Sequence, residues 1–155
     1  MLLKAAHETP LTAYAIADIL KRAGLPDGVL QVLTPDPPGD AVAALLASGI
    51  VRKLSFTGST RVGSLLLSQA AGNIVNCSME LGGNAPFIVC DDADIDAAVD
   101  GAMIAKMRNG GAACTAANRF YVHTQVLDEF TSKFVKRMSA LVVGDGMASA
   151  TTLGP

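Results

Sequence analysis

The sequence predicts an α/β fold, as part of a doubly wound parallel sheet with helices on its faces. The main observation is that strand and helix signals alternate along the chain. A second is the helical spacing of apolar residues in the segment from Leu11 to Leu20. A third is the run of breakers from Gly24 to Gly28, which ends that helix just before a short apolar segment. After Leu81 the pattern changes, so we expect a division into residues 1–81 and 82–155.

The first part carries three predicted helices and three further strands after an opening strand that ends near Lys4. The helical segments are residues 11–20, 41–47 and 61–71, and the strand segments are residues 29–33, 51–57 and 73–81. A proline-rich run from Pro35 to Gly39 is expected to be a loop.

The second part begins with a flexible joint at Gly82-Gly83-Asn84. We expect strands at residues 86–89 and 119–123, a helix from Ile95, a Gly/Ala-rich loop over residues 108–117, and loop after Gly144. The acidic run Asp91–Asp94 precedes the helix and is expected to cap it, because carboxylates satisfy free N–H groups at a helix start. Four residues recur at every fourth position along the last helix: Val126, Phe130, Phe134 and Met138. The aromatic residues among them are expected to be core.

Composition excludes several classes of function. A formal net charge of -2 gives no reason to expect nucleic acid or an anionic membrane as a partner. The opening residues lack the pattern of a signal peptide, and no segment has the length of a transmembrane helix. Three widely spaced cysteines suit a reducing compartment, and we expect a cytoplasmic protein. Two histidines without metal-ligand spacing argue against a zinc site.

Cys114 and Glu80 are the candidates for chemistry. Cys114 follows Asn109-Gly110-Gly111-Ala112-Ala113, where small residues let backbone approach a substrate and leave N–H groups free for an oxyanion. Such a cysteine can be an exposed nucleophile, although an isolated one is more often inert. Glu80 ends an apolar strand, where apolar neighbours would make its carboxylate a better base near neutral pH. A surface glutamate is the alternative.

The segment Phe56–Gly63 joins a strand to a helix through glycine and hydroxyl residues. This arrangement would place N–H groups and the Ser59 hydroxyl where a diphosphate is stabilised. Because the GxGxxG order is missing, a simple helix cap by Ser59 or Thr60 is equally plausible. Lys4, by spacing alone, would be a surface lysine.

Taken together, these segments resemble the aldehyde dehydrogenase superfamily over essentially the whole chain. The matching blocks stand in the family's order: Lys4…Glu8-Thr9-Pro10, Gly24-Leu25-Pro26…Gly28, Ser55–Thr60…Gly63, Glu80-Leu81-Gly82-Gly83 and Cys114. Glu-Leu-Gly-Gly followed by the reactive cysteine after the Gly-rich loop is the most specific combination. Within the superfamily, the runs Glu80–Val89 and Ala117-Asn118-Arg119 are most similar to succinate-semialdehyde dehydrogenases.

The resemblance implies a partial Rossmann-like cofactor domain over residues 1–81, followed by the start of the catalytic domain over residues 82–155. It also implies oxidation of an aldehyde, with succinic semialdehyde the expected substrate, by NAD or NADP. Cys114 would form a thiohemiacetal and then a thioester, and Glu80 would activate the hydrolytic water. By the same resemblance the cofactor would contact six residues: Lys4, His7, Gly58, Ser59, Gly63 and Leu81.

Three positions depart from the family pattern. His7 stands where NAD-preferring relatives often carry a glutamate, so a 2′-phosphate is not repelled and NADP is expected to be tolerated or preferred. Ala112 replaces the glutamine that is usual two positions before the nucleophile. Ala116 stands where some succinate-semialdehyde enzymes carry a second cysteine, so a redox pair with Cys114 through that position is not expected.

The chain is about a third as long as a complete subunit of this family, and it is expected to be an internal fragment with little or no turnover by itself. The complete form is expected to be a homo-oligomer. Two alternatives remain open. One is a cysteine hydrolase that uses Cys114 with His123 as its base. The other is a catalytically inactive remnant that binds a nucleotide or a partner.

Overall fold

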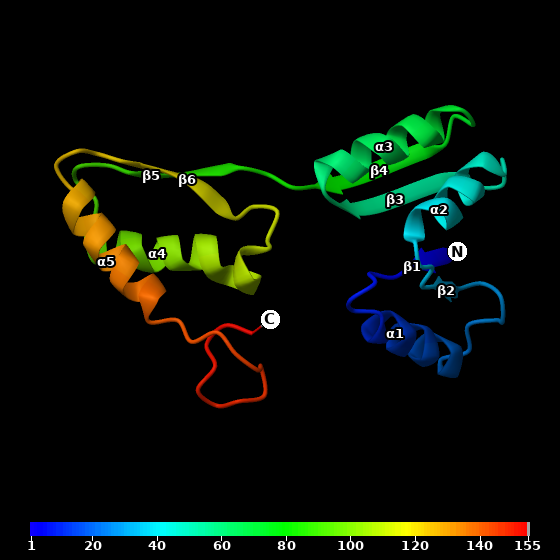
Figure 1. Cartoon of the computed structure of the whole chain (residues 1–155), viewed down its shortest axis with the longest axis horizontal. Helices are drawn as coiled ribbons and strands as arrows, with labels where there is room; N and C mark the ends of the chain where they lie inside the picture. Colours follow the sequence, from blue (N-terminus) through cyan, green and yellow to red (C-terminus); the bar gives the residue numbers. More distant parts are fainter. Residues whose placement is uncertain (155) are drawn as a thin grey trace. The chain divides into compact units, whose positions relative to one another are not determined.

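The computed structural model describes residues 1–154, in which helices and strands alternate as expected (Figure 1). Contacts between residues divide the chain into two compact units. The first unit consists of Met1–Phe56 and Ser64–Ser78, and the second consists of Thr57–Gly63 and Met79–Pro155. The division into residues 1–81 and 82–155 stays a prediction.

The first unit opens with a strand–helix–strand arrangement. β1 (Leu2–Lys4) pairs in parallel with β2 (Gln31–Leu33), and α1 (Leu11–Arg22) connects them. α2 (Pro38–Ala47) follows, so the prediction of a loop through Gly39 was wrong at its end. The reason is that Pro38 occupies the first turn of the helix, where proline has no N–H to leave unpaired and its fixed φ suits the helix.

The next three elements again form a strand–helix–strand arrangement. β3 (Lys53–Gly58) and β4 (Asn76–Leu81) pair with each other, and α3 (Thr60–Ala71) lies between them in sequence. The prediction of a strand from Asn73 was wrong for its first three residues. Ile74 has a positive φ of 52°, which belongs to a left-handed turn conformation and not to a strand.

The second unit contains a β–α–β arrangement with an additional helix. β5 (Ala85–Val89) and β6 (Ala117–Val122) pair in parallel, and α4 (Ile95–Met107) connects them. α4 and α5 (Leu127–Ser139) pack on the same face of these strands (Figure 1).

Aromatic side chains fill the core of this unit. Phe130 of α5 is 2% exposed, and its ring centroid lies 5.6 Å from that of Phe134, 6.3 Å from that of Phe120 and 6.5 Å from that of Phe87. Aromatic pairs at these separations contribute about 0.5–1.5 kcal/mol each beyond the area that they bury. The prediction that the aromatic residues of the last helix belong to the core is confirmed.

The acidic run before α4 acts as a helix cap, as predicted. The Asp94 carboxylate accepts a hydrogen bond from the Ala97 N–H at 3.1 Å. Two ion pairs join α4 to α5: Asp96 accepts from Lys133, and Asp100 accepts from Arg137. The two positions are four residues apart on each helix. These ion pairs are exposed and add little to the stability that the aromatic core provides.

Within residues 1–154, the strands form three two-stranded sheets, which pair β1 with β2, β3 with β4 and β5 with β6. None of the helices in residues 1–154 combines the length and the apolar character needed to cross a membrane.

Candidate active site

Cys114 lies in a turn just before β6 and is a free, exposed thiol. The region predicted as one loop begins with the short segment η1 (Arg108–Gly111), in which Asn109 and Gly110 have non-helical φ and ψ angles. Its last residue, Ala117, already belongs to β6 and is buried. The exposed thiol is therefore presented by a short turn between two defined elements.

Three successive residues ahead of this turn adopt the left-handed backbone conformation. Asn109, Gly110 and Gly111 have φ values of 53°, 65° and 79°. A side chain at Gly111 would also meet the carbonyl oxygen of Lys106, because an added Cβ would lie 3.2 Å from it. Glycine at position 111 thus satisfies both the left-handed conformation and the close packing against α4.

Gly83 brings the Glu80-Leu81-Gly82-Gly83 motif into contact with the Cys114 turn. An added Cβ at Gly83 would lie 2.6 Å from the carbonyl oxygen of Cys114, which is closer than any real side chain can approach. Gly82, by contrast, has no atom within 4 Å of such a Cβ. The second glycine of the motif is therefore required by the close approach of two backbones.

Glu80 stands near the end of β4, three residues before Gly83, and its side chain is exposed. Side chains alternate along this strand, so Met79 and Leu81 point to the partly buried face and Glu80 points away from it. The apolar surroundings that the sequence led us to expect are not supplied by residues 1–154. The exposed carboxylate is accessible to water.

Three polar side chains tie the joint at residues 82–84 to the elements around Cys114. Lys106 Nζ donates to Asn118 Oδ1 at 2.6 Å, and Asn118 Nδ2 donates to the carbonyl oxygen of Gly83 at 3.4 Å. Arg119 Nε donates to the carbonyl oxygen of Asn84 at 3.0 Å. Sequence reasoning noted Asn118 and Arg119 only for their likeness to a family and assigned them no role.

Ser59 and Gly63 lie at the start of α3. Ser59 Oγ accepts a hydrogen bond from the Val62 N–H at 3.3 Å, which is the geometry of a helix cap. The hydroxyl proton is not used in that bond and remains available to a ligand. An added Cβ at Gly63 would lie 2.6 Å from Leu81 Cδ2, so Gly63 permits close packing of the helix on β4.

The charges at the start of α3 would also favour an anion. Its first turn holds no acidic residue and includes Arg61, and the N-terminus of a helix carries partial positive charge. Gly58, the last residue of β3, leads directly into this turn. The cap and the phosphate-binding interpretation are therefore compatible, since one hydroxyl can accept from Val62 and donate to a phosphate oxygen.

Lys4 and His7 belong to the first unit. Lys4 is the last residue of β1, and both side chains are exposed. The carboxyl ends of parallel strands are the edge at which α/β sheets bind ligands. Lys4 lies at such an edge, and the contact of Lys4 and His7 with a cofactor stays a prediction.

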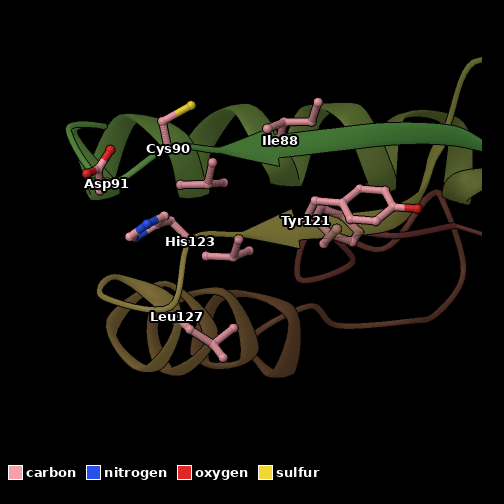
Figure 2. A pocket seen from close by; sticks show the side chains of 9 residues that line it. Ile88, Cys90, Asp91, Tyr121, His123 and Leu127 are labelled. Carbon is pink, nitrogen blue, oxygen red and sulfur yellow. The ribbon is translucent and has the colours of Figure 1, made fainter.

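Cys114 and His123 lie beyond opposite ends of β6, which argues against a cysteine hydrolase. Six strand residues span roughly 20 Å, far beyond the reach of a proton transfer between side chains. His123 instead lines an open hollow of about 520 Å³ with Cys90 and Asp91 (Figure 2). Its Nδ1 accepts a hydrogen bond from the Gln125 N–H at 3.4 Å. Within residues 1–154, no three His, Cys, Asp or Glu side chains are grouped to hold a metal ion.

The turn that bears the Cys114 thiol contacts the Glu80-Leu81-Gly82-Gly83 motif, and the first turn of α3 holds no acidic residue. A dehydrogenase that forms a covalent intermediate would need a nucleophile, a base and a site for its cofactor. The model of the aldehyde dehydrogenase family matches residues 1–155, and the chain belongs to this family. The resemblance inferred from the motifs is confirmed.

The curated relatives that the chain matches include semialdehyde dehydrogenases. The chain is 52% identical over 155 residues to a succinate-semialdehyde dehydrogenase of Paenarthrobacter nicotinovorans, covering 100% of the chain and 34% of that protein. It is 48% identical over 155 residues to a glutarate-semialdehyde dehydrogenase of Pseudomonas putida, covering 100% of the chain and 32% of that protein.

The chain also matches solved structures. A succinate-semialdehyde dehydrogenase from Burkholderia pseudomallei matches with a TM-score of 0.93 and 51% identity, covering 99% of this chain and 32% of the other. An NADP-dependent enzyme of E. coli matches with a TM-score of 0.92 and 50% identity, covering 100% and 32%. The chain thus has the fold of this family and spans about a third of the length of the relatives that it matches.

Proposed function

We propose that the polypeptide to which these residues belong oxidises an aldehyde to a carboxylic acid with NADP or NAD, using Cys114 as the nucleophile and Glu80 as the general base. The observation that carries the proposal is the contact of Gly83 with the carbonyl of Cys114. It places the turn that bears the thiol beside the motif that bears the carboxylate. Membership of the aldehyde dehydrogenase family supports the same assignment.

The chemistry divides between the two residues. The Cys114 thiolate adds to the aldehyde carbon, and the Cys114 N–H helps to hold the resulting oxyanion. When bound, the dinucleotide accepts the hydrogen and electron pair of the aldehyde C–H bond, which leaves a thioester on Cys114. Glu80 then takes a proton from water, the hydroxyl adds to the thioester carbon, and the acid departs with release of the thiolate.

The residues at the start of α3 suit the diphosphate of such a dinucleotide. The Ser59 hydroxyl retains a proton to donate, and the first turn of the helix contains no carboxylate to repel an anion. Gly58 and Gly63 keep side chains away from that turn, and Leu81 packs against Gly63. We assign Lys4 and His7 to the adenosine side of the dinucleotide.

Covalent trapping tests the assignment of Cys114. The chain is incubated with a reactive analogue of succinic semialdehyde, with and without NADP, and the modified peptides are identified by mass spectrometry. We expect selective labelling of Cys114 over Cys77 and Cys90, with protection by NADP. Equal labelling of all three thiols, with no effect of the dinucleotide, would contradict the proposal.

Glu80 is tested in a dehydrogenase that contains residues 1–155. With Glu80→Gln, we expect acylation of Cys114 to persist and hydrolysis of the thioester to slow, by about 100-fold or more, because general-base catalysis contributes factors of this order. The expected time course is a rapid burst of reduced dinucleotide followed by slow steady-state formation. For the 155-residue chain alone, we expect little or no turnover.

The proposed substrate is a short aldehyde that carries a distant carboxylate, with succinic semialdehyde first. The support is that named relatives include both succinate- and glutarate-semialdehyde dehydrogenases. The values of kcat/KM for the two semialdehydes and for an uncharged aldehyde of equal length distinguish these possibilities. A preference for the uncharged aldehyde would overturn the assignment.

His7 underlies a proposed tolerance or preference for NADP. Its side chain is exposed and offers no carboxylate to repel a 2′-phosphate. Relatives named as NADP-dependent support this, among them the succinate-semialdehyde dehydrogenase of E. coli, which is 49% identical. We expect His7→Glu to shift the ratio of kcat/KM values toward NAD by about tenfold, which corresponds to roughly 1.4 kcal/mol. A strong preference for NAD in the unaltered protein would contradict the proposal.

A second candidate function is dinucleotide or partner binding without turnover. The exposure of both Glu80 and Cys114 favours it for the chain by itself, because catalysis by these groups needs a site from which water is controlled. Dinucleotide binding measured by calorimetry, together with no product under single-turnover conditions, would support this candidate.

We propose that the longer, active form is a homo-oligomer.

A further inference from the structure

Lys106, Asn118 and Gly83 form a chain of hydrogen bonds that ends beside the nucleophile. Lys106 lies in the last turn of α4, Asn118 is the second residue of β6, and Gly83 lies in the joint between β4 and β5. The first bond joins Lys106 Nζ to Asn118 Oδ1 at 2.6 Å, and the second joins Asn118 Nδ2 to the Gly83 carbonyl at 3.4 Å. All three residues belong to the second unit.

Both bonds of Asn118 depend on its carboxamide. Its oxygen accepts from a cation while its nitrogen donates to a backbone carbonyl, and an ionised carboxylate, which has no donor, cannot fill both roles. The bond from Lys106 is charge-assisted and is the stronger of the two, so it orients the amide nitrogen toward Gly83. Lys106 therefore fixes the orientation of the Asn118 amide, and the amide nitrogen restrains the Gly83 carbonyl.

The position of Gly83 determines the space left for the Cys114 backbone. Because an added Cβ at Gly83 would lie 2.6 Å from the Cys114 carbonyl oxygen, the two peptide segments touch without an intervening side chain. Lys106 also reaches this turn through its own backbone, since its carbonyl packs against Gly111. A shift of Gly83 is thus transmitted directly to the peptide that carries the thiol.

We propose that Asn118 is a positioning residue for Cys114, oriented by Lys106 and acting through Gly83. It touches neither substrate nor cofactor in this role. It fixes the position of the Glu80-Leu81-Gly82-Gly83 motif relative to the turn that bears Cys114. The assignment of Cys114 as the nucleophile rests on the proposed function. The restraint on the Cys114 turn stands on the contacts alone.

The test compares the alkylation rates of two thiols in the same molecule. Cys114 and Cys90 are both exposed, so the ratio of their rates with iodoacetamide, measured by peptide mass spectrometry, reports the local environment of Cys114. We expect this ratio in the native chain to differ from the ratio in the urea-unfolded chain. With Asn118→Leu, it should move toward the unfolded value by about three- to tenfold, the factor expected for the loss of one hydrogen bond.

Two further variants separate positioning from a general loss of stability. Asn118→Gln keeps a carboxamide at an exposed site with room for one more methylene, and we expect it to recover the native ratio. Asn76 provides a matched control, because it accepts a hydrogen bond from Lys53 in the first unit, as Asn118 does from Lys106. Asn76→Leu should leave the ratio unchanged.

Three results would overturn the proposal: a native ratio equal to the unfolded one, an unchanged ratio in Asn118→Leu, or an equal change in Asn76→Leu. Hydrogen exchange in α4 and α5 shows whether Asn118→Leu remains folded. If it does not, Asn118→Asp, which keeps an acceptor for Lys106 and loses the donor to Gly83, takes its place. No dinucleotide or aldehyde is needed, so failure of the proposed dehydrogenase function and failure of this proposal give different results.

Discussion

The two compact units differ in how completely they bury their apolar residues. In the first unit, α1 has no buried residue, and Leu11 and Ile19 are 79% and 55% exposed. In the second unit, α4 and α5 enclose a cluster that contains Val99 and Phe130, both 2% exposed. The difference teaches that the elements around Cys114 share a buried apolar core within the second unit. The elements that carry Lys4 and His7 bury far fewer apolar side chains.

The largest expected effect comes from removing the centre of the second core. Phe130→Ala should destabilise the second unit by about 3–5 kcal/mol, because a large buried aromatic is lost and a cavity remains. Hydrogen exchange in α4 and α5 measures the effect. The control is Leu11→Ala in the exposed face of α1, where we expect a change within about 0.5 kcal/mol. Equal effects at the two positions would remove the contrast between the units.

A smaller effect is expected at the contact between the two motifs of the site. Gly83→Ala should cost about 1–3 kcal/mol, because the added methyl meets the backbone of Cys114. Gly82→Ala is the matched control, since its added methyl meets no atom within 4 Å. Urea denaturation gives both values, and the rate of Cys114 alkylation shows whether the turn moves. If both variants behave alike, the close approach of Gly83 and Cys114 is not maintained in solution.

The smallest effect concerns the cap that begins α4. Asp94→Ala should cost about 1 kcal/mol, since the Ala97 N–H loses its acceptor. Asp92→Ala removes a carboxylate from the same acidic run without removing that bond, and it should cost less. Thermal unfolding of both variants at one pH makes the comparison. An equal loss in the two variants would indicate that the charge of the run, and not the cap, stabilises the helix.

Local patterns in the sequence predicted most of the elements, because each depends on residues that are near one another in the chain. The four-residue spacing of Phe130 and Phe134 identified both the last helix and its buried face. The errors lie at the ends of elements. Pro38 was assigned to a loop although proline suits the first turn of a helix, and Asn73 was assigned to a strand although the chain turns at Ile74.

The candidate site was predicted less completely, because its geometry depends on residues far apart in the sequence. Motifs identified Cys114 and Glu80, but nothing in their spacing shows that Gly83 contacts the Cys114 carbonyl. The bond from Asn118 to Gly83 joins residues 35 positions apart, and no local pattern reports it. The exposure of Glu80 agrees with the alternative of a surface glutamate, but the sequence could not decide it, since an alternating strand has two faces and the sequence does not say which one is covered.

The parallel pairing of β5 with β6 has a consequence for the order in which the molecule is made. Parallel strands cannot form as a hairpin, so Val89 finds its partner Val122 only after the connecting helix and the turn have been synthesised. Closing so long a segment is slow compared with forming a local turn. On a translating ribosome, β5 is therefore left without its partner strand until α4, the Cys114 turn and β6 have all emerged.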